Sequence, residues 1–118
     1  MSDELKRQGN EAAKAGDYDK AVELYTEAIK IDENNHILYS NRANIYNMKK
    51  DYDHALEDAE KCISIAPNFG KGYVRKADAL MGLGRQNEAM LALDEGSKQN
   101  PNDELIEARR QGIIAHSQ

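Results

Sequence analysis

The chain has 118 residues, with 16 Lys and Arg against 21 Asp and Glu and a formal net charge of −5. This length suits a single domain with a modest core, and the acidic balance argues against the large positive field used to bind nucleic acid. No apolar run approaches the roughly 20 residues of a membrane span, and the acidic start Met1-Ser2-Asp3-Glu4 is unlike a signal peptide. We therefore expect a cytoplasmic protein that binds neither membranes nor nucleic acid.

Start and stop signals divide the chain into short helices joined by tight breaks. Gly16-Asp17 and Gly84 mark breaks inside helical pairs, and Asn34-Asn35, Pro67 and Pro101 mark breaks between pairs. The composition lacks the alternation of β-branched and aromatic residues that strands need, so an all-α fold is expected. Seven helices are predicted, over residues about 2–15, 18–31, 36–49, 52–66, 69–83, 86–99 and 103–116.

The last of these helices is expected to cover the apolar face that the preceding pair of helices leaves exposed. The segment Asn102-Asp103-Glu104 has the composition of a helix start. An apolar stripe is predicted along this helix, formed by Leu105, Ile106, Ala108, Gly112 and Ile113. A terminal hairpin leaves one face uncovered, so a capping helix with a polar outer side is physically required.

An internal repeat organises the chain, because the spacing from Ala21 to Ala55 is the same as the spacing from Ala55 to Ala89. Two further positions carry small residues in every repeat, namely Gly9, Ala43 and Ala77, and Ala28, Cys62 and Gly96. Large residues recur at Leu5, Tyr39 and Tyr73. Small residues let facing helices approach while large residues fill the remaining space, so the pattern predicts hairpins that pack on one another.

On these positions, and on Tyr25, Pro67 and Pro101, the chain resembles the tetratricopeptide repeat family along nearly all its length. The resemblance implies an all-α, right-handed superhelix of three helix-turn-helix hairpins plus a C-terminal capping helix. It also implies a single domain over residues 1–118, with repeats over about 2–35, 36–69 and 70–102 and the cap over about 103–116.

The first helices of the three predicted hairpins share a polar face. It carries pairs of residues three or four apart, namely Lys6 and Asn10, Asn41 and Asn44, and Lys71 and Arg75. Such spacings put each pair on one side of its helix. In stacked hairpins the first helices line the concave surface, so these faces converge on a groove.

Charge is segregated as well. No acidic residue occurs from Asn34 to Lys50, whereas the helix that follows contains Asp53, Glu57, Asp58 and Glu60. We therefore expect a basic groove inside an acidic shell, an arrangement that selects an anionic ligand such as an acidic peptide end.

The stretches Glu4–Asn10, Leu38–Arg42 and Gly70–Lys76 resemble the dicarboxylate-clamp tetratricopeptide domains of co-chaperones. They look most like the N-terminal domain of co-chaperones that organise the heat-shock protein 70 and 90 classes. The resemblance implies five residues that hold the terminal carboxylate and last Asp of a Glu-Glu-Val-Asp tail, namely Lys6, Asn10, Asn41, Lys71 and Arg75. The implied partners are the C-terminal tails of heat-shock protein 70, which is favoured, and heat-shock protein 90, in the stress response.

Further residues are expected to line the groove and to read the upstream part of the tail, namely Asn44, Asn47, Met48, Asp78 and Met81. The alternative is a scaffold array that binds internal segments or copies of itself and does not recognise a carboxylate. A requirement for a free peptide C-terminus separates the two. The isolated domain is expected to be monomeric.

We expect no catalysis, cofactor or metal. The chain has no glycine-rich phosphate loop and no nucleophile elbow, and His36, His54 and His116 are scattered without a ligand set. Cys62 is expected to be a buried thiol, and the six tyrosines are expected to pack in the core rather than to stack on bases.

Overall fold

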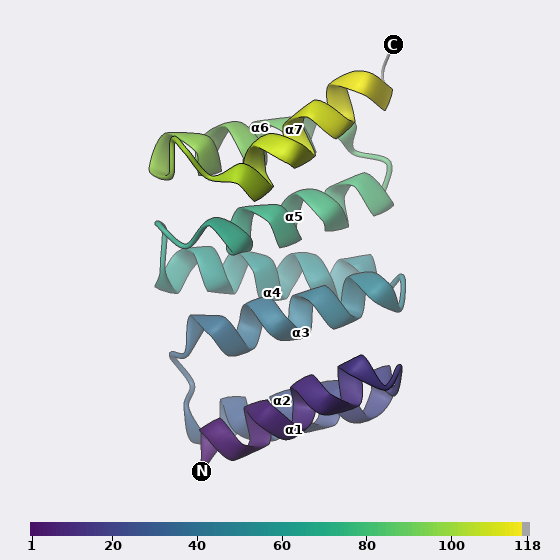
Figure 1. The fold of residues 1–118 in the computed structure, drawn as a ribbon, viewed down its shortest axis with the longest axis vertical. Helices are drawn as coiled ribbons and strands as arrows, with labels where there is room; N and C mark the ends of the chain where they lie inside the picture. The colour runs from purple at the N-terminus through teal and green to yellow at the C-terminus, as the bar shows by residue number, and fades with distance from the viewer. Residues whose placement is uncertain (117–118) are drawn as a thin grey trace.

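The computed structural model describes residues 1–116, which form a stack measuring 44 × 25 × 21 Å (Figure 1). Seven helices are present over this range, close to the predicted bounds, and no strand is found among residues 1–116. They are α1 (Ser2–Lys14), α2 (Tyr18–Ile31), α3 (His36–Met48), α4 (Tyr52–Ile65), α5 (Gly70–Gly82), α6 (Gln86–Gln99) and α7 (Glu104–His116). They form three hairpins plus a capping helix, as expected.

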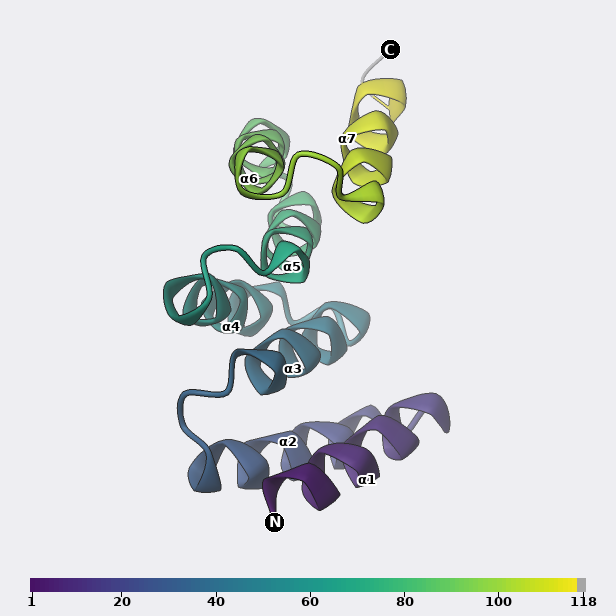
Figure 2. The same ribbon diagram turned by 60° about the vertical axis from the view of Figure 1, so that its left-hand side comes forward.

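The helices form two layers. Figure 1 shows the odd-numbered helices in front of the even-numbered ones, and Figure 2 shows α4 and α6 on the opposite side of the stack from α3, α5 and α7. Each hairpin packs on the next through α2 and α3, α4 and α5, and α6 and α7. Residues of α1 and α3 line a shared hollow, α3 contacts α5, and α5 contacts α7, so the odd-numbered helices form one surface.

The turn inside each hairpin has the same backbone geometry. Gly16, Lys50 and Gly84 occupy the same position of successive repeats and have φ values of 80°, 64° and 76°. After them, Asp17 and Asp51 cap the second helix of their hairpins by accepting hydrogen bonds from the N–H groups of Lys20 and His54. Glycine adopts a positive φ without steric cost, whereas lysine does not, so the second hairpin has a strained turn.

The small positions of the repeat allow close helix contacts, as predicted. A Cβ atom on Gly9 would lie 2.7 Å from the ring of Tyr25, and one on Gly96 would lie 2.8 Å from Tyr73 Cβ. Tyr25, Tyr39 and Tyr73 are buried in agreement with the prediction, whereas Tyr18, Tyr46 and Tyr52 remain partly exposed. The thiol of Cys62 is fully buried, and burial raises its pKa to about 11, so it packs as an apolar group.

Buried tyrosines also join consecutive hairpins. The hydroxyl of Tyr39 donates a 2.9 Å hydrogen bond to the carbonyl of Glu33, and that of Tyr73 donates a 2.5 Å bond to the carbonyl of Pro67. Both bonds hold the linker that precedes the helix. They recur at the same position of consecutive repeats, so the angle between hairpins is set by a repeated contact.

A buried ion pair joins the two helices of the second hairpin, and its arginine also bonds to the first hairpin. Arg42 on α3 donates to both carboxylate oxygens of Asp58 on α4, at 2.7 and 2.8 Å, and to the hydroxyl of Thr26 on α2 at 3.0 Å. Asp58 is only 6% exposed. The expectation that Asp58 belongs to an acidic outer shell is therefore wrong, because a cation from the neighbouring helix draws this carboxylate inward.

The apolar stripe predicted for α7 is partly wrong. Ile106 and Ile113 are buried against α5 and α6, but Ala108 and Gly112 are exposed. Residues 106 and 113 are seven apart and return to the same side after two turns, whereas residue 108 lies about 200° away around the helix. The side chain of Asp103 accepts hydrogen bonds from the N–H groups of Leu105 and Ile106 and so starts the helix.

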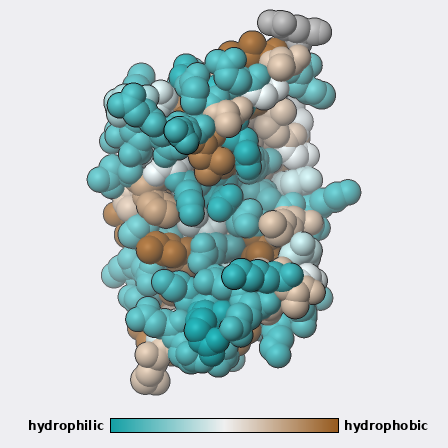
Figure 3. Space-filling view, in the orientation of Figure 1, coloured by the Kyte–Doolittle hydropathy of each residue, from teal (hydrophilic) through white to brown (hydrophobic). Residues whose placement is uncertain are grey.

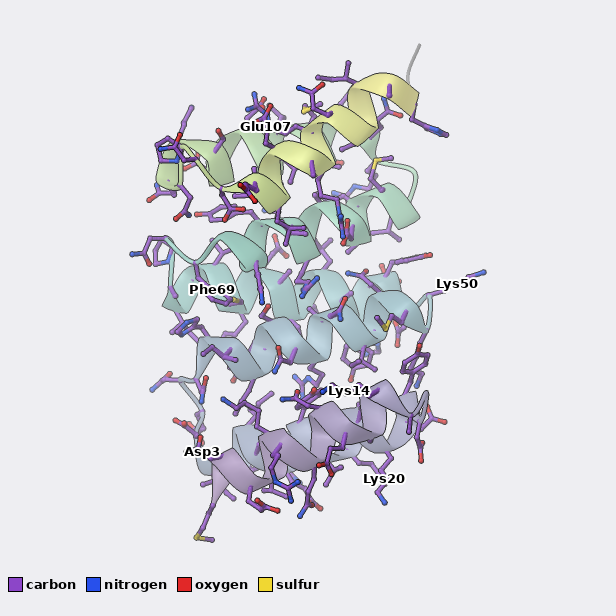
Figure 4. All side chains as sticks on the ribbon, in the orientation of Figure 1. Asp3, Lys14, Lys20, Lys50, Phe69 and Glu107 are labelled. Carbon is purple, nitrogen blue, oxygen red and sulfur yellow. The ribbon has the colours of Figure 1, made fainter. Side chains whose placement is uncertain are left out.

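Replacing Lys50 by glycine is expected to stabilise the fold. The side chain projects from the α3–α4 turn into solvent (Figure 4), so its loss removes the left-handed strain without removing packing. That strain costs roughly 1–2 kcal/mol, and added chain entropy cancels part of it, so we expect a net gain of up to about 1 kcal/mol. Urea denaturation measures the effect. Lys61→Gly, at an exposed position inside α4, is the matched control and should destabilise by about 1 kcal/mol.

Arg42→Met is expected to destabilise the protein by about 3–5 kcal/mol, because it leaves the carboxylate of Asp58 buried without its cation. The double variant Arg42→Met with Asp58→Leu should recover most of that loss, since it removes both charges. Thermal and urea unfolding of the wild type, the two single variants and the double variant give the coupling energy between Arg42 and Asp58. Equal destabilisation by the single and double variants would mean that the pair acts only by filling space.

Candidate peptide-binding groove

The odd-numbered helices present the predicted polar positions on one surface. Figure 3 shows this face as mainly hydrophilic, with separate smaller hydrophobic patches. The five expected clamp residues come from three of these helices, with Lys6 and Asn10 on α1, Asn41 on α3, and Lys71 and Arg75 on α5. The stacking of the hairpins is therefore what brings the three segments onto one face.

Asn10 and Asn41 lie together. They line a hollow of about 260 Å³ between α1 and α3, together with Asn44 and Lys14. The hydroxyl of Tyr25, which is buried, donates a hydrogen bond to Oδ1 of Asn10. Because that oxygen is occupied as an acceptor, the NH₂ group of Asn10 is left to donate toward the hollow. The hollow is thus lined by amide donors beside a cation.

Arg75 is unusual among the arginines of the chain. Arg7, Arg42, Arg85, Arg109 and Arg110 all form ion pairs, but within residues 1–116 Arg75 forms none. Its Nε atom is buried and donates no hydrogen bond to any described residue. Burial lowers the pKa of this guanidinium, because the charged form loses hydration, and nearby Asp78 opposes the effect. A half-buried, unpaired cation of this kind favours an incoming anion.

The two lysines of the predicted clamp are also unpaired. Lys6 is half-buried on α1 and Lys71 is exposed in the first turn of α5. Neither forms an ion pair with any residue of the described part of the chain, whereas Lys49 and Lys76 do. All three predicted clamp cations therefore keep their charge available to a ligand.

The predicted lining residues divide into two groups. Asn44 lies in the asparagine hollow, and the side chain of Asn47 donates a 3.2 Å hydrogen bond to the backbone carbonyl of Arg75, which fixes α5 against α3. Met48 is half-exposed at the end of α3. Asp78 and Met81 instead lie beside the capping helix.

Two groove residues were missed by the sequence analysis. Lys14 lines the asparagine hollow, and it is four residues after Asn10, so the helical spacing could have indicated it. Arg109 on α7 forms a 3.0 Å ion pair with Asp78, which neutralises the acid next to Arg75. Arg109 follows Arg75 by one repeat period, so the period extended into the cap could have found it.

No group of three or more His, Cys, Asp or Glu side chains within residues 1–116 is arranged to hold a metal ion. None of the described helices is long and apolar enough to cross a membrane.

A curated relative and two solved structures resemble the chain. The "Heat shock protein sti1 homolog" of Schizosaccharomyces pombe is 48% identical over 103 residues, which is 87% of this chain and 17% of that protein. The structure of the TPR2B domain of yeast Sti1 in complex with pHsp70 superposes with a TM-score of 0.89 at 27% identity, covering 98% of this chain and 97% of that one. The first TPR of Spaghetti (RPAP3) bound to the HSP90 peptide SRMEEVD gives 0.88 at 27% identity, covering 98% and 91%.

Profiles of the tetratricopeptide repeat cover most of the sequence. One described as "TPR repeat" matches residues 9–50, and two described as "Tetratricopeptide repeat" match residues 36–69 and 70–103. Together with the seven-helix stack and the constant repeat period, these matches establish that the chain belongs to the tetratricopeptide repeat family.

Proposed function

We propose that the groove of the odd-numbered helices binds the C-terminal Glu-Glu-Val-Asp tail of cytoplasmic heat-shock protein 70 and 90 class chaperones, with the 70 class favoured. The main support for the proposal is Arg75, which is partly buried beside the groove and forms no ion pair with any residue that the structure describes. The domain then acts as a co-chaperone module that binds but does not catalyse.

Each member of the proposed clamp has a distinct part. Lys71 and Arg75 compensate the negative charge of the terminal carboxylate and the last Asp side chain, and Arg75 gains the partner that it lacks. Asn10 and Asn41 donate directional hydrogen bonds from the α1–α3 hollow. Lys6 adds charge at the edge, and Lys14 extends the positive field along the same helix.

The comparisons support the proposal at the level of the family. The yeast Sti1 domain and the RPAP3 domain were solved with heat-shock protein partners, and both cover nearly all of this chain. The RPAP3 ligand ends in Glu-Glu-Val-Asp, the same tail chemistry that the unpaired cations here suit.

Simple energetics predict moderate affinity. Hydrogen bonds to charged groups contribute about 1.5–3 kcal/mol each before the ordering of a flexible tail is subtracted. A dissociation constant on the order of micromolar, near −8 kcal/mol, is expected. Higher salt should weaken binding, since the site is partly open to solvent.

Calorimetric titration with octapeptides from each chaperone class, each with a free or amidated C-terminus, tests the clamp. We expect micromolar binding of the free-acid peptides and at least about tenfold weaker binding after amidation, because the carboxylate loses its cations. Lys71→Ala and Arg75→Ala should each weaken the free-acid complex. Lys61→Ala is the control, since it removes the same charge from the exposed side of α4.

Two results would contradict the clamp. If amidated peptides bind as well as free acids, the chain is a scaffold that recognises internal segments. If Lys61→Ala weakens binding as much as Arg75→Ala, only the overall charge matters. The ratio of affinities for the two free-acid tails measures the preference for the 70 class.

Arg75→Met should separate binding from folding. Methionine keeps the apolar stem but removes the buried, unsatisfied Nε, whose desolvation costs roughly 1–3 kcal/mol. We therefore expect an unfolding free energy equal to the wild type or up to about 1 kcal/mol higher, with tail binding abolished. Urea denaturation beside the same titration checks both. A clear loss of stability would mean that Arg75 serves to stabilise the fold instead.

A further inference from the structure

A second and larger hollow lies away from the clamp. It is a groove of about 580 Å³ between α4 and α6, with α5 as its floor. Figure 2 shows α4 and α6 on the side of the stack opposite the odd-numbered helices. Apolar side chains from all three helices line it, namely Leu56, Ile63, Leu80, Leu91 and Ala92.

The chain itself contains a filled version of this groove, one repeat earlier. Between α2 and α4, Arg42 reaches across to Asp58 and lies over the ring of Tyr46, with Cζ 5.9 Å from the ring centroid. The equivalent residues of the next repeat are Lys76, Leu80 and Ala92. A ring and a carboxylate are thus missing from the second site, and the space that they fill in the first site is open.

The edge of the second groove is also more apolar than the edge of the first site. The position held by Glu57 in the first site is held by Leu91 in the second, and Leu91 is 66% exposed. The exposed side chain of Leu91 extends the apolar surface of the hollow, and an apolar surface of this kind can be covered by a partner protein.

The charges around the groove leave one acid uncompensated. Lys76 lies 3.6 Å from Glu60, and Arg85 pairs with Glu88 at 2.5 Å. Glu95, which replaces Lys61 of the first site, forms no ion pair with any described residue. A ligand that places a basic group next to an apolar one would complement this edge.

We propose that the α4–α6 groove binds an amphipathic helix of a partner protein. A large aliphatic side chain of that helix inserts over Leu80 and Ala92 and contacts Leu91. An arginine or lysine beside it pairs with Glu95. An amphipathic helix suits the site because the groove is open and runs between two helices, whose surface ridges accept a third.

This site is independent of the proposed clamp. Arg75 and Lys76 are neighbours on α5, but Lys76 lines the α4–α6 groove while the backbone of Arg75 is held by Asn47 of α3. A tail peptide and a helix are therefore expected to bind at the same time. Failure of one site leaves the other intact.

The probe is an N-acetylated, C-amidated helix of about 16 residues built from Ala, Leu and Arg, with leucines on one face and arginines flanking them. Amidation keeps it out of a carboxylate clamp. We expect NMR titration of the labelled protein to show saturable shifts in α4 and α6 at submillimolar affinity. Saturating the protein with a free-acid tail peptide should leave this affinity unchanged.

The test variants introduce residue types of the filled site at the equivalent positions of the open groove. Leu91→Glu restores the residue type of Glu57 at an exposed position and should weaken the helix at least about tenfold. Lys76→Arg with Ala92→Asp rebuilds the buried pair and should do the same. The matched control, Glu57→Leu, exposes a leucine over the filled site and should create no second binding site.

Three results would overturn the proposal. Shifts confined to α1, α3 and α5 would mean that the probe binds elsewhere. Equal binding by Leu91→Glu, or by a probe with glutamates in place of arginines, would remove the proposed contacts. If the free protein self-associates and Leu91→Glu abolishes that self-association, the occupant of the α4–α6 groove is a second copy of this chain.

Discussion

No hairpin of this chain can bury its own apolar face, and this constraint governs the rest of the structure. Each hairpin packs its two helices through a small residue against a ring, as Gly9 does against Tyr25 and Gly96 does near Tyr73. The remaining apolar side must lie against the next hairpin, and α7 covers the last one through Ile106 and Ile113. Stacking is therefore a condition of folding, and the repeated tyrosine contacts to the linkers fix its geometry.

Stacking also sorts the charges. Ion pairs neutralise most arginines, including Arg42 inside the second hairpin and Arg109 at the cap. Four cations on the first helices form no ion pair within residues 1–116, namely Lys6, Lys14, Lys71 and Arg75, and they belong to one layer because every hairpin places its first helix there. The half-buried guanidinium of Arg75 loses hydration, and its Nε gains no partner among the described residues, a loss that the proposed ligand would offset.

Departures from the repeat carry as much information as the repeat itself. Lys50 has a strained, positive φ at the turn position where the other hairpins have glycine. Ala92 and Leu80 leave a groove where Asp58 and Tyr46 fill the equivalent space. A repeated fold provides an internal reference for each site, so the change at one repeat can be read against its neighbours.

The sequence alone determined the helices and their pairing, because apolar spacing, glycine turns and prolines act locally. It also indicated that Asn10 and Asn41 belong to one face, since helical spacing and the repeat period together predict on which side of its helix each residue lies. The two residues do line one hollow in the structure. Three features of the charged residues became visible in the folded structure alone: Asp58 is buried by Arg42, Asp78 pairs with Arg109, and Arg75 forms no ion pair with any described residue. The tertiary structure likewise decided which residues of α7 are covered and where the α4–α6 groove opens. Those outcomes depend on side chains from different helices meeting in space, and no local pattern in the sequence specifies which of several available acids or cations will meet.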